Sequence, residues 1–168
     1  MKIYDKVKEV AQYFKDQQPA RWAIGIDPGT NCGLGVWDMQ EMRLNAIYTL
    51  STMNAMDMVL EYANRGGCMV LVEDARLRKH FGDTGRERLQ GAGWAKAASK
   101  QWEDFLKHYK ILYRMQKPGS TWKGAAAGKT WASITKWKGK TSDHARDAAW
   151  LVFEMSRTKM EVLCGVMS

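Results

Sequence analysis

A short apolar run that ends in a carboxylate, Trp22–Asp27, constrains the fold more than any other part of the chain. A Pro28-Gly29 turn follows it, and a second apolar run, Gly33–Trp37, can return beside the first as a strand. Asp27 then lies where a buried strand meets its turn, with Gly25 leaving open space beside it. Burial of a carboxylate is costly unless a cation or hydrogen-bond donors meet it. Asp27 is therefore either a turn residue that accepts backbone N–H bonds or part of a functional site.

The order of the remaining segments predicts an α/β fold with a five-stranded mixed sheet. Short links between the first three strands favour an antiparallel meander. A helix that Ser51 or Thr52 caps precedes the fourth strand, and the right-handed crossover rule makes that strand parallel to the first. Glu73 then ends the strand next to the one that Asp27 ends. The predicted strands are 21–27, 33–38, 43–50, 68–72 and 110–115, and the predicted helices are 52–64, 87–109, 129–137 and 142–155.

Length and composition describe one globular domain. The 168 residues are 45% hydrophobic and 26% charged, and residues 1–18 have the pattern of an amphipathic helix that extends a domain over 19–168. No apolar run approaches the roughly 20 residues that span a bilayer, and the amino terminus lacks the apolar stretch of a signal peptide. Three scattered cysteines, Cys32, Cys68 and Cys164, predict neither disulfides nor a zinc site. We expect a cytoplasmic protein with no membrane partner.

The positive charge is concentrated in the second half of the chain. Between Arg76 and Arg146 there are 17 Lys and Arg against five Asp and Glu, whereas residues 1–75 hold seven against ten. Five tryptophans are interleaved with these basic residues. A segregated basic segment with aromatic side chains favours a polyanionic partner, in particular nucleic acid. A membrane surface is less well supported, because no basic amphipathic anchor stands apart from the fold.

A second acidic cluster opens the last predicted helix. Asp147 lies one helical turn after Asp143 and His144, so it shares a face with both. Asp143 beside Ser142 is equally well explained as an N-terminal cap, whereas Asp147, which precedes an apolar stretch, is less readily a surface acid. Oxygen ligands with one imidazole suit Mg²⁺ or Mn²⁺ better than Zn²⁺. Two such ions about 3.5–4 Å apart can activate water and stabilise the leaving 3′-oxygen of a phosphodiester.

Three motifs, taken in order, resemble those of the RuvC family of Holliday junction resolvases, within the RNase H-like superfamily. The resemblance covers about residues 21–155 and implies an RNase H-like five-stranded mixed sheet, a homodimer, and paired nicks across a four-way junction with divalent metal. It implies Mg²⁺ or Mn²⁺ as cofactor, two ions per active site, and branched DNA as partner, with no nucleotide cofactor. The implied catalytic and metal-binding residues are Asp27, Glu73, His144 and Asp147, with Asp143 an additional candidate ligand. The motifs are Ile24-Gly25-Ile26-Asp27-Pro28-Gly29-Thr30, Val72-Glu73 and His144-Ala145-Arg146-Asp147-Ala148.

Departures from the bacterial pattern suggest a divergent member, of the kind that phages or mobile elements carry. The chain has the N-terminal extension, a Pro-Gly turn one residue shorter, and Asp74-Ala75-Arg76 where the family often places an aromatic residue that stacks at the junction. Phe81 is a candidate substitute. Two alternatives stay open: another RNase H-like nuclease for branched or single-stranded DNA, and a junction-binding protein without activity. Actin-like ATPases share the strand-Asp-x-Gly-Thr pattern, but two such domains do not fit in 168 residues.

Two basic segments are the predicted DNA contacts, one after Glu73 and one after Pro118. Trp122 is the tryptophan that we expect to stack on a base, and Lys129 or Lys136 is a candidate to reach the scissile phosphate. The predicted contacts are Arg76, Arg78, Lys79, Phe81, Arg86 and Arg88 in the first segment, and Lys117, Trp122, Lys123, Lys129, Lys136, Lys138 and Lys140 in the second.

Overall fold

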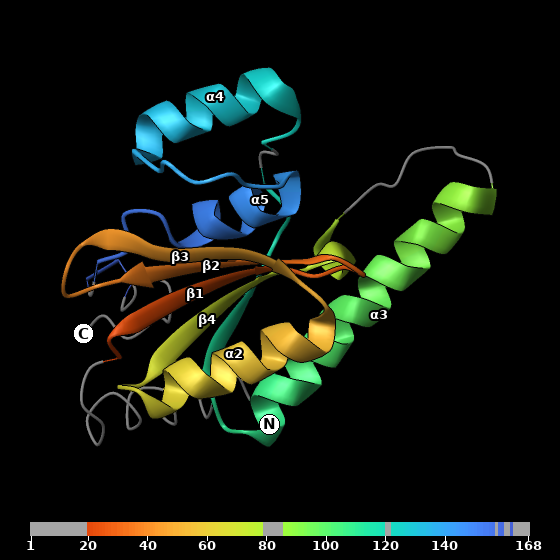
Figure 1. The fold of residues 1–168 in the computed structure, drawn as a ribbon. Helices are drawn as coiled ribbons and strands as arrows, with labels where there is room; N and C mark the ends of the chain where they lie inside the picture. Colours follow the sequence, from red (N-terminus) through yellow and green to blue (C-terminus); the bar gives the residue numbers. More distant parts are fainter. Residues whose placement is uncertain (1–19, 79–85, 120–121, 157, 160–161, 163–168) are drawn as a thin grey trace.

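The computed structural model describes residues 20–78, 86–119, 122–156, 158–159 and 162, and its centre is a sheet of order β3-β2-β1-β4-β5 (Figure 1). Strands β1 (Trp22–Asp27), β2 (Cys32–Asp38) and β3 (Arg43–Leu50) form an antiparallel meander. Strands β4 (Cys68–Glu73) and β5 (Leu112–Gln116) continue the sheet as parallel strands beyond β1. The predicted mixed sheet is thus confirmed. The predicted helix over 1–18 lies outside the described residues.

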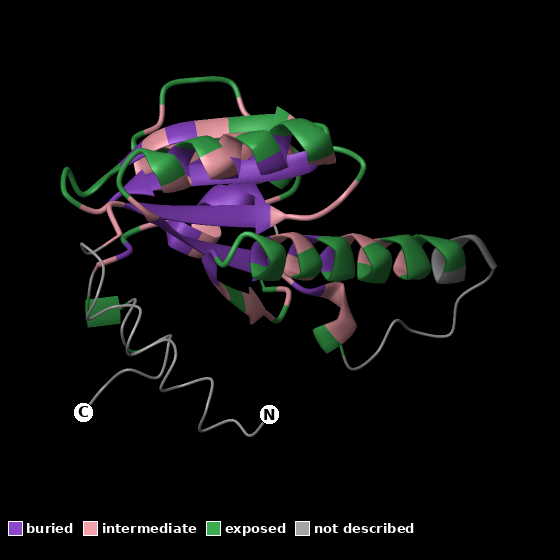
Figure 2. Cartoon of the chain, turned by 90° about the horizontal axis from the view of Figure 1, so that it is seen from below, coloured by how far each residue is buried: buried purple, intermediate pink, exposed green. Residues whose placement is uncertain are grey.

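Helices cover both faces of the sheet. Helices α2 (Thr52–Asn64) and α3 (Arg86–His108) lie on one face, and α4 (Gly124–Thr135) and α5 (Asp143–Val152) lie on the other (Figure 1). A 3₁₀ turn, η1 (Ala75–Leu77), follows β4. Each face has its own apolar core, one around Trp102 and one around Trp131, and buried residues accordingly concentrate along the strands (Figure 2). No helix in the described ranges is long and apolar enough to cross a membrane.

Helix α4 begins five residues earlier than the predicted helix over 129–137, and that prediction is corrected. The Ala125-Ala126-Ala127 run, which lies before the predicted start, favours a helix and extends it towards the N-terminus. Gly124 has a φ of +80°, a conformation that glycine adopts without strain, so it permits the sharp entry into the helix. Tertiary packing of Trp131 on the sheet then fixes the segment as helix.

Three glycines on the central strands let α5 lie directly on the sheet. A Cβ atom at Gly25 would lie 1.9 Å from the carbonyl oxygen of Ala148, and one at Gly33 would lie 2.0 Å from that of His144. Gly35, which pairs with Gly25 across the two strands, is equally crowded by α5. The open space expected beside Gly25 is therefore filled by the backbone of the last helix. These contacts hold α5 closer to the sheet than any side chain would permit.

The N-terminus of α5 is fixed next to the end of β1. Ser142 caps the helix, because its hydroxyl oxygen accepts a hydrogen bond from the backbone N–H of Ala145 at 3.1 Å. The same hydroxyl is hydrogen-bonded to the Thr49 hydroxyl of β3 at 2.5 Å. Cap and glycine contacts together determine which residues of α5 stand over the carboxyl end of β1.

Substitution of Gly33 by alanine tests this close packing. A Cβ atom there overlaps backbone rather than a flexible side chain, so α5 must move away from the sheet. We expect Gly33→Ala to lower the free energy of unfolding by about 3 kcal/mol or more in urea denaturation. Gly93→Ala in α3 is the matched control, because a Cβ there meets nothing within 4 Å, and alanine should stabilise the helix by up to about 1 kcal/mol. Equal stability of the two variants would contradict the close-packing argument.

Candidate active site

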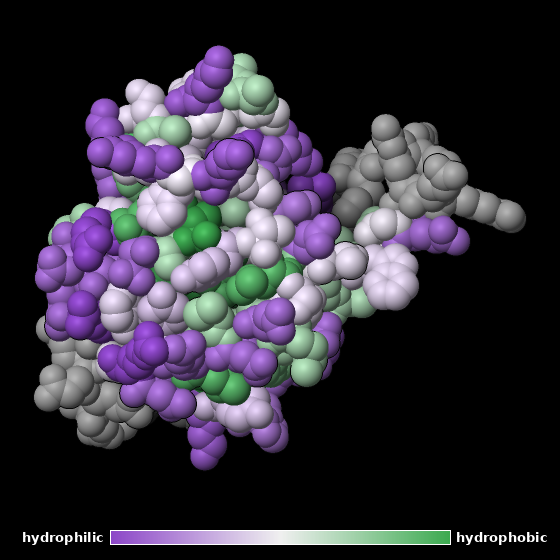
Figure 3. All heavy atoms as spheres, viewed as in Figure 1, coloured by the Kyte–Doolittle hydropathy of each residue, from purple (hydrophilic) through white to green (hydrophobic). Residues whose placement is uncertain are grey.

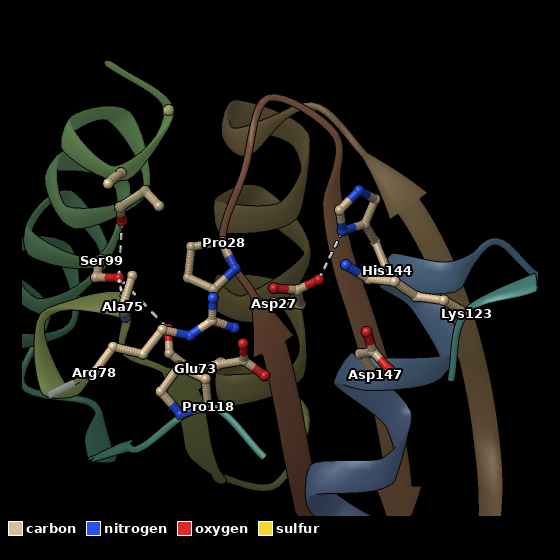
Figure 4. A pocket seen from close by; sticks show the side chains of 13 residues that line it. Asp27, Pro28, Glu73, Ala75, Arg78, Ser99, Pro118, Lys123, His144 and Asp147 are labelled. Carbon is tan, nitrogen blue, oxygen red and sulfur yellow. Dashed lines mark hydrogen bonds and ion pairs between the residues drawn. The ribbon is translucent and has the colours of Figure 1, made fainter. Parts of the chain in front are cut away.

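A cleft of about 560 Å³ opens where the carboxyl ends of β1 and β4 meet the N-terminal half of α5 (Figure 4). Asp27 and Glu73 end these adjacent parallel strands, so their side chains emerge at the same edge of the sheet. His144 and Asp147 enter the cleft from α5. The four residues implied as catalytic by the sequence resemblance therefore line one cleft, although they come from three distant segments of the chain.

The opposite wall of the cleft consists of small side chains from α3. Gly91, Ala92, Ala95 and Ser99 line it, together with Ala75 of η1. The Ser99 hydroxyl accepts a hydrogen bond from the Ala75 backbone N–H at 3.2 Å and also bonds the Ala95 carbonyl oxygen at 3.0 Å. Helix α3 is thus tied to the turn that follows Glu73, and its small residues leave the space in front of the carboxylates open.

The three carboxyl groups of the cleft repel one another in partly buried positions. Burial, reinforced by the charges of Asp27 and Asp147, raises the pKa of Glu73 to about 7. Burial also raises the pKa of Asp27, although its hydrogen bond to His144 Nδ1 at 2.7 Å opposes this change. The pKa of Asp147 is likewise raised by burial, against a 2.6 Å hydrogen bond that its Oδ1 accepts from the Trp122 backbone N–H. A cation in the cleft would relieve this repulsion.

Two basic side chains, Arg78 and Lys123, also line the cleft. Both are exposed, and each lowers the pKa of Asp27 and Glu73 by its charge. Lys123 was predicted as a general DNA contact, and its place beside the carboxylates could not be read from the sequence. Lys129 and Lys136, the candidates predicted to reach a scissile phosphate, are not among the residues that line the cleft.

The donor set of the cleft fits a hard divalent cation. Carboxylate oxygens are the ligands that Mg²⁺ and Mn²⁺ prefer, and three carboxyl groups with one imidazole face this space. Burial is the main cause of the raised pKa of Glu73, and the negative charges of Asp27 and Asp147 add to it. As the described side chains now lie, no three His, Cys, Asp or Glu groups converge closely enough to hold an ion together.

Asp143, the fifth predicted ligand, does not line the cleft. Its carboxylate pairs with the Arg146 guanidinium and accepts a long hydrogen bond, 3.4 Å, from the Gly124 backbone N–H. Ser142 rather than Asp143 provides the side-chain cap of α5. Asp143 therefore connects α5 to the segment that leads into α4, and its role as a ligand stays a prediction.

Two of the predicted DNA contacts are engaged within the protein. The Arg76 guanidinium forms ion pairs with Asp74 at 2.7 Å and Glu103 at 2.8 Å, so its donors are largely used. The Trp122 ring packs edge-on against Trp150 with centroids 4.8 Å apart, and its indole nitrogen is buried, which does not suit base stacking. These contacts within the protein compete with DNA for both side chains, and their predicted roles as DNA contacts stay predictions.

The remaining predicted contacts are either exposed or not described. Lys79 and Phe81 lie outside the described residues, as do the side chains of Arg86 and Arg88. Figure 3 shows hydrophilic side chains spread over the face that Figure 1 presents, with only small hydrophobic areas between them. The exposed basic residues of the prediction are Arg78, Lys117, Lys123, Lys129, Lys136, Lys138 and Lys140.

Among solved structures, that of T. thermophilus RuvC in complex with Holliday junction substrate is similar to this chain. The TM-score is 0.50 at 19% sequence identity, and the similarity covers 79% of this chain and 91% of that chain. No protein-family model matches the sequence, and no curated protein matches it. At this identity the similarity shows the fold, which is the RNase H-like fold of RuvC. The fold predicted from the three motifs is thereby confirmed.

The ion pairs behind η1 predict a loss of stability in acid. Hydrogen bonds from Lys107 and Arg76 lower the pKa of Glu103 to about 2. Because this value lies below that of the unfolded chain, the pairs stabilise the fold above about pH 4.5 and lose their effect as the pH falls towards 2. Glu103→Gln should lower the free energy of unfolding by about 1–2 kcal/mol near neutral pH, as measured by urea denaturation.

The difference in the free energy of unfolding between the wild type and Glu103→Gln should become steadily smaller when urea denaturation is repeated down to about pH 3. Asp104→Asn is the matched control, since Asp104 is an exposed acid of the same helix, and its effect should stay small throughout. A difference for Glu103→Gln that is independent of pH would show that lost packing, and not charge, accounts for it.

Proposed function

We propose that this protein is a divalent-metal-dependent endonuclease that resolves four-way DNA junctions by paired nicks. The observation that carries the proposal is the meeting of three partly buried carboxyl groups, from β1, β4 and α5, in one cleft beside Arg78 and Lys123. A carboxylate cluster alone would repel a phosphodiester, so the combination with cations is the informative feature. The fold shared with T. thermophilus RuvC, whose structure contains Holliday junction substrate, supports the same assignment.

Asp27, Glu73 and Asp147 are the residues that would hold Mg²⁺ or Mn²⁺, with two ions in each site. When bound, these ions supply Lewis acidity that activates water and stabilises the leaving 3′-oxygen. His144 holds the Asp27 carboxylate through its Nδ1 atom, and the Trp122 N–H holds that of Asp147. The two hydrogen bonds fix the orientation of carboxylates that would otherwise rotate freely, which lowers the cost of assembling the site.

The exposed cations and the α3 wall would bring DNA to these carboxylates. Arg78 and Lys123 face the cleft and can attract the phosphate from the solvent side. Gly91, Ala92 and Ala95 place no long side chain in front of the carboxylates, so a sugar-phosphate backbone can approach them closely. The cleft therefore combines cations that attract a phosphate, space for the sugar-phosphate backbone, and acid-base or metal-binding groups. Phosphodiester hydrolysis needs all three.

Paired nicks require two active sites, and the described residues of one chain form one such cleft. The proposal therefore includes a homodimer whose two clefts act on the two strands that are cut. Symmetry supports this arrangement, because a two-fold dimer presents identical sites to a four-way junction of similar symmetry. Sedimentation of the protein with and without junction DNA would measure the stoichiometry directly.

The central experiment compares nicking of a synthetic four-way junction with nicking of linear duplex of the same sequence. With Mg²⁺ or Mn²⁺ we expect symmetric nicks confined to the junction, and no cleavage after chelation. Cleavage of duplex at the same rate would indicate a general RNase H-like nuclease. Tight junction binding without any nick in either metal would indicate a binding protein without activity.

Substitution of the carboxylates should separate cleavage from binding. We expect Asp27→Asn and Glu73→Gln each to slow nicking at least about a hundredfold, because each removes a negatively charged oxygen donor from the ion. Junction affinity measured by fluorescence anisotropy in EDTA should not fall, since both changes reduce repulsion of the phosphates. Asp57→Asn on the exposed side of α2 is the matched control and should nick normally. Normal cleavage by Asp27→Asn would refute the proposed site.

Salt dependence should report the collective contribution of the exposed cations. Seven predicted basic contacts are exposed, so the logarithm of junction affinity should fall steeply with the logarithm of salt concentration. Replacement of one of them, as in Lys138→Ala, should reduce that slope by about one unit without affecting the nicking rate at saturation. Lys159→Ala, outside the basic segment, should leave the slope unchanged. A shallow slope for the wild type would exclude the basic surface as the DNA-binding face.

A further inference from the structure

We propose that Arg146 is a positioning residue, whose guanidinium fixes Lys123 and Asp147 relative to one another and thereby sets the charge balance of the cleft. The proposal rests on the proposed nuclease function, since it concerns the same site. Arg146 follows His144 in the sequence motif but does not line the cleft, and no chemistry was assigned to it from the sequence. Its side chain lies on the other side of the segment that carries Lys123.

The guanidinium of Arg146 is buried, with 6% of the residue exposed, and is almost fully used as a donor. Its Nε and Nη2 atoms donate to the carbonyl oxygen of Trp122 at 2.9 and 2.7 Å. Its Nη1 atom donates to the carbonyl and hydroxyl oxygens of Thr141 at 3.1 and 3.2 Å. Nη2 also reaches the Gly124 carbonyl oxygen at 3.5 Å and pairs with Asp143. One side chain thus joins two loops to α5.

The backbone on both sides of Lys123 is held by α5 through these contacts. The Trp122 N–H donates to Asp147 Oδ1 at 2.6 Å, and its carbonyl oxygen accepts from Arg146. The Gly124 carbonyl oxygen also accepts from Arg146 at 3.5 Å. Among the residues at 122, 123 and 124, Lys123 is the one that lines the cleft (Figure 4). A segment held at Trp122 and at Gly124, the residues on either side of Lys123, has little freedom to move its middle side chain away.

Helix α4 encloses the guanidinium from the remaining side. A Cβ atom at Gly128 would lie 3.3 Å from Arg146 Cζ, so a glycine at this position lets the helix pack against the flat guanidinium group. A lysine at position 146 could not replace these contacts, because its single ammonium cannot bond the Trp122 and Thr141 carbonyls in the same planar arrangement. The geometry therefore requires arginine specifically and not only a positive charge.

The position of Lys123 matters because its ammonium lines the same cleft as the three carboxyl groups, those of Asp27, Glu73 and Asp147. Asp147 is held through the same segment, since the N–H that bonds its carboxylate belongs to Trp122, the residue whose carbonyl oxygen Arg146 holds. Displacement of this segment would therefore move a cation and release a carboxylate at the same time, and small displacements of reacting groups have large effects on rate.

The test measures single-turnover nicking of a four-way junction by Arg146→Gln, Arg146→Lys, Lys123→Ala and the double variant Arg146→Gln/Lys123→Ala. We expect Arg146→Gln to slow nicking on the order of tenfold to a hundredfold, with junction affinity in EDTA nearly unchanged. Arg146→Lys should recover only part of the rate. In the Lys123→Ala background the same Arg146→Gln change should slow nicking by a markedly smaller factor, because the side chain that Arg146 positions is gone.

Hydrogen exchange provides a readout that does not depend on activity. In Arg146→Gln the amides of Trp122 and Gly124 should exchange faster than in the wild type, whereas in Lys123→Ala they should not change. Arg21→Gln is the matched control, since it loses an ion pair with the buried Asp38 at the other end of β1. It should lose stability but should nick at the wild-type rate per folded molecule.

The outcomes distinguish this proposal from the proposed function. If the wild type nicks no DNA, the nuclease assignment fails, and hydrogen exchange alone then decides whether Arg146 fixes the segment. If the wild type nicks junctions, two outcomes would show that the positioning role is wrong while the nuclease assignment stands. Arg146→Gln could nick at the full wild-type rate, or the substitution could slow nicking by the same factor with and without Lys123. If Arg146→Gln does not fold, the same measurements on Arg146→Lys decide, and unchanged exchange there would overturn the proposal.

Discussion

The close contact between the backbone of α5 and the glycines of β1 and β2 is the constraint on which the rest of the structure depends. Aspartate and histidine side chains are short, so a helix separated from the sheet by ordinary side chains would leave His144 and Asp147 away from Asp27. Gly25 and Gly33 remove that separation, with Ala148 and His144 carbonyl oxygens where a Cβ would stand. Glycine weakens an isolated strand, and burial of the central strands on both faces offsets this cost.

The same packing creates the electrostatic problem that the cleft presents. Bringing carboxyl groups from three elements into one partly buried space raises the pKa of each of them, most strongly for Glu73. Local contacts compensate only in part: a histidine meets Asp27, a backbone N–H meets Asp147, and two cations stand across the cleft. Residual repulsion of this kind is typical of sites that trade stability for function, and under the proposed function a divalent cation would complete the charge balance of the cleft.

The sequence predicted the sheet and the acidic residues because both depend on local patterns. Apolar runs and the crossover rule determine the strand order, and the carboxylates stand at strand ends or one helical turn apart. The features that the sequence did not reveal are contacts between residues from distant segments of the chain. Gly25 was interpreted as open space, although the small residues at 145, 148 and 149 were a signal that a helix could pack there. Arg76 looked free, since Glu103, one of its partners, lies on another helix.

A count of basic residues overestimates the surface available to DNA because arginine and lysine have different roles here. Arg76 and Arg146 lie in the basic segment, yet both are held by fixed acceptors: carboxylates for one, chiefly backbone carbonyls for the other. The planar guanidinium suits such fixed multiple bonds, whereas the flexible ammonium of lysine suits an exposed site that attracts phosphate. Among the described residues, six lysines between 117 and 140 are exposed, as is Arg78 at the cleft. Arg76 and Arg146 therefore build the framework around the cleft, whereas Arg78 and the exposed lysines supply the positive charge that would attract a polyanion.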